Sequence, residues 1–206
     1  MAEPASKDAS GHYFEPNPSS PSAPQEIRLD LPDLSLTLVT DRGVFSPDRI
    51  DTGTKHLLLD GPAPASAGTL VDLGCGYGPI ACALARRSPA ATVWAVDVND
   101  RALELCRGNA ERLGLRNVHA VASERVPADL VVDELWSNPP IRIGKGALHE
   151  LLGSWLRRLA PGGRALLVVQ KHLGADSLHR WMESEGWAVD RRSSRAGYRV
   201  FEVRPV

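Results

Sequence analysis

The chain has 206 residues, of which 43% are hydrophobic and 24% are charged, and its formal net charge is −1. These values suit one globular domain with a sizeable core, and no apolar run approaches the roughly 20 residues needed to cross a bilayer. The first residues include Glu3 and Asp8 instead of a basic start and an apolar stretch, so we expect no signal peptide. Cys75, Cys82 and Cys106, like the six histidines, lack metal-ligand spacing. This pattern predicts no metal site and a reducing, cytoplasmic setting.

Charge is distributed unevenly along the chain. Residues 140–206 carry 12 Lys and Arg against 6 Asp and Glu, whereas residues 1–70 carry 5 against 10. A basic excess of this kind fits a nucleic-acid partner, because phosphates attract clustered cations. A solvated basic face explains the same numbers, so charge alone leaves both interpretations open.

The first predicted elements follow a Pro- and Ser-rich stretch. Its composition predicts a flexible arm at residues 1–25, followed by a single domain at residues 26–206. Within the arm, His12-Tyr13-Phe14 is an apolar island that we expect to dock onto the domain. Alternating apolar and polar residues over 26–40 predict a small β-hairpin extension, and residues 43–59 then form a loop leading into a helix.

A regular alternation of strands and helices comes next. Buried apolar runs predict strands, and the amphipathic segments between them predict helices. We expect strands at 69–73, 92–98, 118–122, 130–136 and 164–170, helices at 79–87, 100–113, 145–159 and 175–185, and a closing hairpin at 187–192 and 198–204. Pro161-Gly162-Gly163 is expected to be a turn. This order predicts an α/β fold with a doubly wound, mostly parallel sheet and an antiparallel C-terminal hairpin.

A glycine-rich loop, Val71-Asp72-Leu73-Gly74-Cys75-Gly76-Tyr77-Gly78, connects the first of these strands to its helix. Glycines let the backbone turn tightly against a ligand. Dinucleotide-binding loops place a third glycine where this chain has Pro79, which argues against NAD. Asp72 favours a cationic ligand, and Asp97, which ends the next strand, is placed for ribose hydroxyls. These features resemble the S-adenosylmethionine site of class I methyltransferases, and Cys75 fits a small filler better than a nucleophile.

A second motif, Ser137-Asn138-Pro139-Pro140, follows the strand expected at 130–136, at the end where open α/β sheets bind ligands. Prolines lack an N–H group and fix φ, so we expect Asn138 to be extended and the Pro139 carbonyl to be free to accept. Two acceptors that converge on one point suit a planar –NH2 group. The alternative for the tripeptide alone is a Pro-rich loop that only ends a strand, and the glycine loop upstream weakens that alternative.

These motifs carry a family resemblance. Residues 43–54, Leu57-Leu58, and Ser137–Pro140 with Gly144 are similar to the corresponding segments of small-subunit ribosomal RNA guanine-N2 methyltransferases. The Ile-Arg-x-Gly-Lys ending at 141–145, like the aromatic island in the arm, is closer to single-domain archaeal-type relatives. The resemblance covers about residues 12–204. It implies a Rossmann-like methyltransferase fold, S-adenosylmethionine as cofactor and RNA as substrate.

The resemblance also implies a site in three parts. The catalytic segment is Asn138, Pro139, Pro140 and Ile141; the cofactor contacts are Asp72, Gly74, Cys75, Gly76, Gly78, Asp97, Val98, Ser123, Asp51 and Thr54; the substrate contacts are Arg142 and Lys145. Ser123 equally fits a surface turn, and Asp51 with Thr54 equally fits helix capping. Solvated side chains are the alternative for Arg142 and Lys145.

Ile141 departs from the wider Asn-Pro-Pro group, which often has an aromatic residue there that can stack on a flipped base. Isoleucine packs against a base but has no π face. We expect either the guanidinium plane of Arg142 or the segment around Phe45 to take that part.

The expected chemistry is polarisation of an amine. The Asn138 side-chain oxygen and the Pro139 carbonyl would accept hydrogen bonds from an exocyclic amino group and align its nitrogen, without a proton-abstracting residue. The pair serves guanine N2, adenine N6, cytosine N4 or a glutamine amide. We expect an RNA methyltransferase with ribosomal guanine N2 as the first candidate. Protein-glutamine methylation gains nothing from the basic C-terminal third, and intact Asp72, Asp97 and Asn138 argue against a non-catalytic cofactor-binding module.

Overall fold

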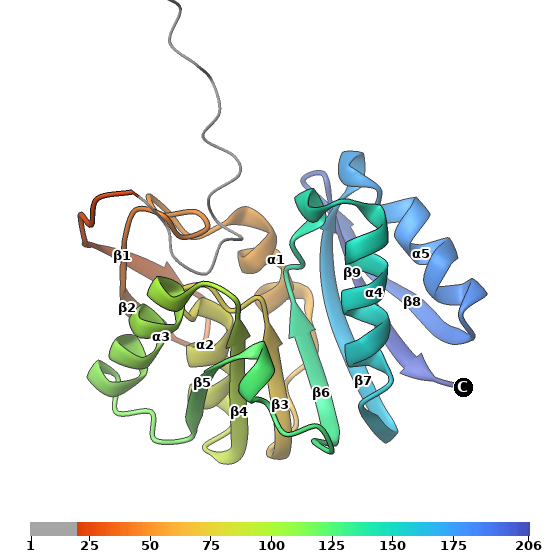
Figure 1. Ribbon diagram of the computed structural model, residues 1–206, viewed down its shortest axis with the longest axis horizontal. Helices are drawn as coiled ribbons and strands as arrows, with labels where there is room; N and C mark the ends of the chain where they lie inside the picture. Colours follow the sequence, from red (N-terminus) through yellow and green to blue (C-terminus); the bar gives the residue numbers. More distant parts are fainter. Residues whose placement is uncertain (1–19) are drawn as a thin grey trace, which may run out of the picture.

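The computed structural model describes residues 20–206, which form a sheet covered by helices on both faces (Figure 1). The sheet has seven strands in the order β5-β4-β3-β6-β7-β9-β8. In that order they are Val118–Ala122, Ala90–Asp97, Ala67–Leu73, Val132–Ser137, Leu159–Gln170, Tyr198–Pro205 and Trp187–Arg195. The first five run parallel, and β9 pairs antiparallel with both β7 and β8. The doubly wound sheet and its C-terminal hairpin are confirmed.

Two apolar clusters hold the helices to the sheet. Leu70 of β3 belongs to one cluster and its neighbour Val71 to the other, because successive strand residues face opposite sides. The first cluster includes residues of α1 (Thr52–Asp60), α2 (Pro79–Arg87) and α3 (Asp100–Arg112), and the second includes residues of α4 (Lys145–Leu156) and α5 (Ala175–Ser184). Short 3₁₀ turns at Ser123–Arg125, Ile141–Ile143 and Lys171–Leu173 follow β5, β6 and β7.

The predicted N-terminal hairpin is present as a separate two-stranded sheet, β1 (Gln25–Asp30) and β2 (Ser35–Thr40). Asn109 of α3 fixes it to the domain: its side chain accepts from the Val39 N–H at 2.7 Å and donates to the Val39 carbonyl at 2.8 Å. Arg87 of α2 adds a bidentate contact to Asp33, with both distances 2.8 Å. The extension therefore covers α2 and α3.

The described end of the predicted flexible arm, residues 20–25, contacts the domain. The Ser22 hydroxyl and the Ala23 N–H donate to the Asp41 carboxylate at 2.6 and 2.5 Å, and Arg101 donates to the Ser20 carbonyl at 2.9 Å. β1 begins at Gln25, one residue before the expected domain start. The rest of the arm, including the aromatic island at residues 12–14, lies outside the described residues.

The predicted boundary between α4 and β7 was wrong, because α4 ends at Leu156 and not at residue 159, and β7 begins at Leu159. Pro161-Gly162-Gly163 lies within β7 and not in a turn before it. The pairing of β6 with β7 jumps from Val132↔Leu159 to Glu134↔Arg164, so these residues form an irregularity in a continuous strand. A Cβ on Gly163 would meet the Ala160 and Asp133 carbonyl oxygens at 3.0 Å, which favours glycine at this close approach.

Two features are absent from residues 20–206. None of the helices there has the length and apolar character required to cross a membrane. The same residues hold no group of three or more His, Cys, Asp or Glu side chains placed to bind a metal ion.

Candidate active site

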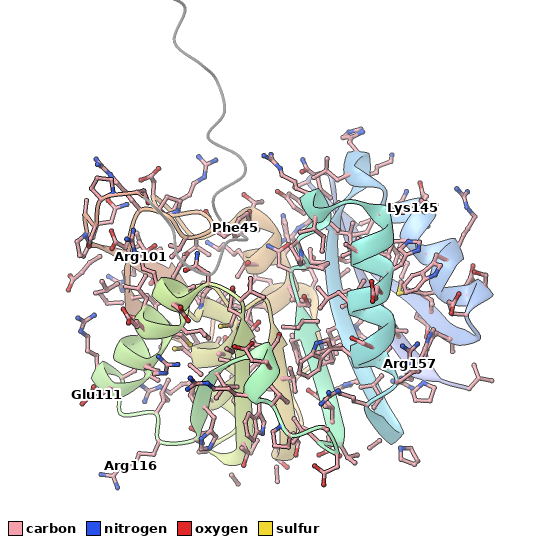
Figure 2. The ribbon with its side chains drawn as sticks, viewed as in Figure 1. Phe45, Arg101, Glu111, Arg116, Lys145 and Arg157 are labelled. Atoms are coloured by element: carbon pink, nitrogen blue, oxygen red, sulfur yellow. The ribbon has the colours of Figure 1, made fainter. Side chains whose placement is uncertain are left out.

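A cleft of about 610 Å³ opens at the carboxyl edge of the parallel strands. The glycine loop, the loop before α1, the Asn-Pro-Pro segment and the adjoining ends of β7 and β9 border it. Most of the predicted site residues line it: Asp51, Gly74, Gly76, Asp97, Val98, Ser123, Asn138, Pro139, Pro140, Ile141 and Arg142. Figure 2 shows Phe45 and Lys145 towards this end of the molecule, and Arg116 and Arg157 towards the opposite end. The motifs that are separate in sequence thus meet at one site.

Backbone hydrogen bonds fix the glycine loop to β4. The N–H groups of Gly74 and Cys75 both donate to the Val96 carbonyl, at 2.8 and 3.0 Å. The Gly76 N–H donates to Asp97 Oδ2 at 2.8 Å. Gly76 has φ +55°, and a Cβ there would have no atom within 4 Å. The loop is therefore held from behind while its other side leaves room for a ligand to approach the backbone.

Asp97 organises the end of β4. Its Oδ1 accepts from the Val98 and Asn99 N–H groups at 2.8 and 3.0 Å, in addition to the bond from Gly76 to Oδ2. Burial raises the pKa of Asp97 above its ordinary value, although the three N–H donors oppose that shift. The side chain still lines the cleft. Since each carboxylate oxygen has two lone pairs, Oδ2 retains acceptor capacity.

Asp72 lies behind the loop and does not line the cleft. Its side chain is fully buried, and Oδ2 accepts from the Ala81 N–H in the first turn of α2 at 2.9 Å. Burial, with a smaller effect of the nearby Asp97 charge, raises the pKa of Asp72 to about 8. The carboxyl group therefore carries a proton at neutral pH. Direct contact with a cationic ligand, as predicted from sequence, is not what the structure shows, because the side chain turns towards α2.

Cys75 and Gly78 also face the core, where a third residue, Cys106, meets them. Cys75 is 3% exposed, and burial raises the pKa of its thiol, which fits a filler and not a nucleophile. Gly78 precedes α2 with φ +92°, and a Cβ there would lie 2.6 Å from Cys106 Sγ. The glycine allows close packing of the loop on α3, so neither residue reaches the cleft.

The side-chain amide of Asn138 is held in one orientation by the start of α1. Its Nδ2 donates to Asp51 Oδ2 at 2.8 Å and to Thr54 Oγ1 at 3.1 Å. An ionised carboxylate only accepts hydrogen bonds, so the group facing Asp51 is the –NH2. The Asn138 oxygen has no hydrogen-bond partner among residues 20–206, and the residue lines the cleft. The amide therefore presents an unpaired acceptor at the site.

Asp51 has a second structural role besides its contact with Asn138. It is the N-cap of α1, and its Oδ2 accepts from the Thr54 N–H at 2.9 Å. The structure thus shows the helix-capping role of this pair, and Asp51 also lines the cleft. The additional contact with Asn138 could not be predicted from sequence, because 84 or more residues separate the partners.

The prediction of a free Pro139 carbonyl was wrong. This oxygen accepts from the Ile141 N–H at 2.8 Å across Pro140, which has φ −74° and ψ 74°, the geometry of an inverse γ-turn. A carbonyl has two lone pairs, so one remains for another donor. The preceding residue, Ser137, donates its hydroxyl to the Leu73 carbonyl at 2.6 Å and ties this segment to the glycine loop.

Two further predicted residues lie outside the cleft lining. Thr54 is buried in α1 beneath Asn138, and Lys145 is exposed as the first residue of α4. Sequence reasoning missed several residues that do line the cleft: Val44, Arg49, Asn99, Leu151, Gln170, Leu173 and Tyr198. Gln170 ends an expected strand and Tyr198 begins another, so their positions at strand ends were a usable signal.

Comparison with known proteins identifies the family. Residues 35–202 match the model of the methyltransferase small domain. The chain belongs to this family. Uncharacterized protein YbxB of Bacillus subtilis (strain 168) is 33% identical over 200 residues, covering 96% of this chain and 100% of that protein. Ribosomal RNA small subunit methyltransferase C of Shewanella halifaxensis is 34% identical over 151 residues, covering 71% of this chain and 43% of that enzyme. The chain thus spans less than half of the latter.

A solved structure shares the fold. The 16S rRNA N2 methyltransferase of T. thermophilus, in complex with AdoMet and guanosine, superimposes with a TM-score of 0.77 at 24% identity, covering 90% of this chain and 52% of that one. The predicted Rossmann-like methyltransferase fold is confirmed. Family membership likewise confirms the predicted class, a class I methyltransferase that uses S-adenosylmethionine.

Proposed function

We propose that this protein transfers a methyl group from S-adenosylmethionine to an exocyclic amino nitrogen of RNA, with guanine N2 of small-subunit ribosomal RNA as the acceptor. The observation that carries the proposal is the Asn138 amide, whose nitrogen is occupied by Asp51 and Thr54 while its oxygen is unpaired at the cleft. The ribosomal RNA methyltransferases among the relatives support the acceptor class. The guanosine of the T. thermophilus complex supports the base.

The residues at the glycine loop fit the cofactor. Gly76 leaves open space against its backbone, and Asp97 offers a carboxylate oxygen for ribose hydroxyls at the end of β4. Val98 and Ser123 border the same part of the cleft, where an adenine ring would lie. When bound, S-adenosylmethionine supplies a methyl group on a positively charged sulfur. The protein's own task is then to hold and align the acceptor.

Asn138 and Pro139 would align the acceptor nitrogen. The Asn138 oxygen accepts one N–H of the amino group, and the remaining lone pair of the Pro139 carbonyl accepts the other. These bonds orient the nitrogen lone pair towards the methyl group and stabilise the positive charge that develops on nitrogen. The N–C bond forms as the S–C bond breaks, and the surplus proton leaves to water. Because Asp51 and Thr54 fix the amide beforehand, little reorganisation is needed during the reaction.

Basic side chains near the cleft support a polyanionic acceptor. Arg142 is exposed and lines the cleft, Lys145 begins α4 directly after the same 3₁₀ turn, and Lys171 is exposed where β7 ends. Phosphates of an RNA strand would find cations on this rim of the site. A neutral glutamine in a protein loop would draw no advantage from them.

A transfer assay tests the proposal. Tritiated S-adenosylmethionine is supplied with deproteinised ribosomal RNA, with assembled small subunits, or with release-factor-type proteins as acceptors. We expect label in RNA from one of the first two and none in the proteins. Label only in protein would refute the RNA acceptor. Cofactor binding without transfer to any acceptor would make the protein a binding module.

A further inference from the structure

The strand order divides the cleft into two parts. Gly74, Gly76 and Asp97 lie at the ends of β3 and β4, whereas Gln170 and Tyr198 lie at the ends of β7 and β9. Asn138 follows β6, which separates β3 from β7. With the cofactor over β3 and β4, the acceptor meets Asn138 from the side of β7 and β9. The residues there are therefore candidates for holding the acceptor.

Gln170 and Tyr198 form a pair across the sheet. They are register partners in the antiparallel ladder of β7 and β9, so their side chains stand next to each other on the same face. Both line the cleft. Neither the Gln170 amide nor the Tyr198 hydroxyl has a hydrogen-bond partner among the described residues. The Tyr198 ring and the unpaired Gln170 amide therefore lie next to each other on the acceptor side of the cleft.

The Tyr198 ring is held firmly beside the group that orients Asn138. A Cβ on Gly53 would lie 2.9 Å from both Tyr198 Cε1 and Asp51 Oδ2, so the ring packs against the first turn of α1. The His56 ring is 5.8 Å away on the same helix. Burial, and then the Asp51 charge, raises the pKa of Tyr198, which keeps the phenol neutral. The ring is therefore a fixed, uncharged surface at the cleft.

Phe45, the other aromatic residue of the lining, belongs to the opposite part. It is 46% exposed, but its loop is fixed to the end of β4 by a 2.9 Å bond from Asn99 Nδ2 to the Gly43 carbonyl. Ile141, at the acceptor side, has no π face. Tyr198 is the aromatic residue that the sheet places beside Asn138.

We propose that Tyr198 and Gln170 form the subsite for the acceptor base. The Tyr198 ring supports one face of the nucleobase, and the Gln170 amide, with two donors and one acceptor, bonds its polar edge. This inference rests on the proposed function. It assigns the aromatic contact to the C-terminal hairpin instead of to Arg142 or the Phe45 segment.

The test compares Tyr198→Leu, which removes the ring, with Tyr198→Phe, which keeps it. KM and kcat for a ribosomal RNA acceptor are measured at saturating cofactor, together with cofactor affinity by calorimetry and the unfolding temperature. Loss of one stacked base predicts a KM for RNA raised on the order of tenfold in Tyr198→Leu. Tyr198→Phe, which keeps the ring, should raise KM for RNA much less than Tyr198→Leu, and cofactor affinity should not change in either.

Two more variants serve as comparison and control. Gln170→Leu should raise KM for RNA with little effect on folding, because its amide bonds to no described residue, and it keeps the test open if Tyr198→Leu does not fold. Trp187→Leu changes an aromatic residue at the other end of the β8–β9 hairpin, next to Pro205 in the ladder, and should leave KM unchanged.

Each of the following outcomes would contradict the proposed base subsite. An unchanged KM in Tyr198→Leu and Gln170→Leu, with RNA still methylated, refutes it and leaves the proposed function standing. Lower cofactor affinity and kcat with an unchanged KM would show a structural role for the ring. A raised KM in Phe45→Leu, with Tyr198→Leu unaffected, would move the contact to Phe45. If wild type labels only protein, the proposed function fails and the base subsite fails with it.

Discussion

The two halves of the cleft are built in different ways. On the cofactor side, backbone N–H groups of residues 74–76 and 98–99 bond to β4 and to the Asp97 carboxylate, and the shape depends on glycines. On the acceptor side, the surface consists of side chains from the start of α1, the end of β6 and the β7–β9 ladder. In the proposed function the first half holds S-adenosylmethionine and the second half holds the acceptor. Substitutions in the two halves should therefore affect different measured quantities.

The largest effect is expected for Asn138→Ala. Loss of a preorganised acceptor at the reacting nitrogen should lower kcat on the order of 10²–10³-fold, with cofactor affinity nearly unchanged. Single-turnover transfer and calorimetry measure the two quantities. A rate near that of wild type would contradict the polarising role of Asn138. An equally large loss of cofactor affinity would contradict the division of the cleft into a cofactor half and an acceptor half.

Asp97→Ala should show the converse behaviour. The substitution removes three backbone contacts of the loop and the oxygen offered to the ribose, and should weaken S-adenosylmethionine binding by about 1–3 kcal/mol. RNA binding measured without cofactor should stay as in wild type. Equal losses for both ligands would mean that Asp97 supports the whole cleft.

Asp51→Ala tests how much the fixed orientation of the Asn138 side-chain amide contributes to kcat. Without this carboxylate, Asn138 keeps only its bond to Thr54, and α1 loses its cap, which costs about 1 kcal/mol of stability. We expect kcat to fall on the order of tenfold, a smaller loss than for Asn138→Ala. The control is Ser22→Ala, which removes a contact to Asp41 far from the amide. An unchanged kcat in Asp51→Ala would show that the amide is oriented by other means.

RNA binding by the basic side chains at the edge of the acceptor half should depend on salt concentration. Replacing both Arg142 and Lys145 by Ala removes two exposed cations, so the logarithmic salt dependence of RNA binding should become shallower by about 1–2. KM for RNA should rise by a few fold, and cofactor binding should not change. The control is a double change of Arg112 and Arg116, on and just after α3. Equal salt slopes for wild type and the rim variant would exclude phosphate contacts from these two residues.

Because the pKa of Asp72 is raised, we expect the stability of the folded protein to depend on pH, whereas binding of the acceptor should not depend on this group. Its folded pKa of about 8 lies above the ordinary value of 3.8, so between these values the folded state holds a proton that the unfolded state lacks. Stability must then fall as pH rises from about 4 to about 8. Asp72→Asn should flatten this decline, as followed by urea unfolding at several pH values. An unaltered decline in the variant would contradict a protonated Asp72.

The sequence predicted that the glycine loop and Asp97 lie at one edge of the sheet because these parts are local, although Asp72, Cys75, Gly78 and Thr54 do not line the cleft as expected. The glycine loop and Asp97 belong to one β–α–β unit, and strand ends in such units meet at a known edge. The acceptor half was predicted in part. The Asn-Pro-Pro motif was found, whereas the pairing of Gln170 with Tyr198 depends on the β7–β9 register and the Asn138 contacts depend on how α1 packs.

Two local errors have physical causes that motif reading does not include. The Pro139 carbonyl was expected to be free because both prolines lack N–H groups, but the next donor along the chain, Ile141, closes a γ-turn onto it. Asp72 was expected at the ligand because it neighbours the loop, but a residue in the last positions of a central strand alternates into the core. In both cases the hydrogen-bond partner decided the role.

Identification of the methylated nucleoside tests the account most directly. Ribosomal RNA is labelled by the wild-type protein, digested to nucleosides and analysed by chromatography and mass spectrometry, with Asn138→Ala beside it. The proposed chemistry predicts label in N2-methylguanosine for wild type and almost none for the variant. Label on a ribose oxygen or a ring carbon, or equal labelling by the variant, would contradict methyl transfer to an amino nitrogen held by Asn138.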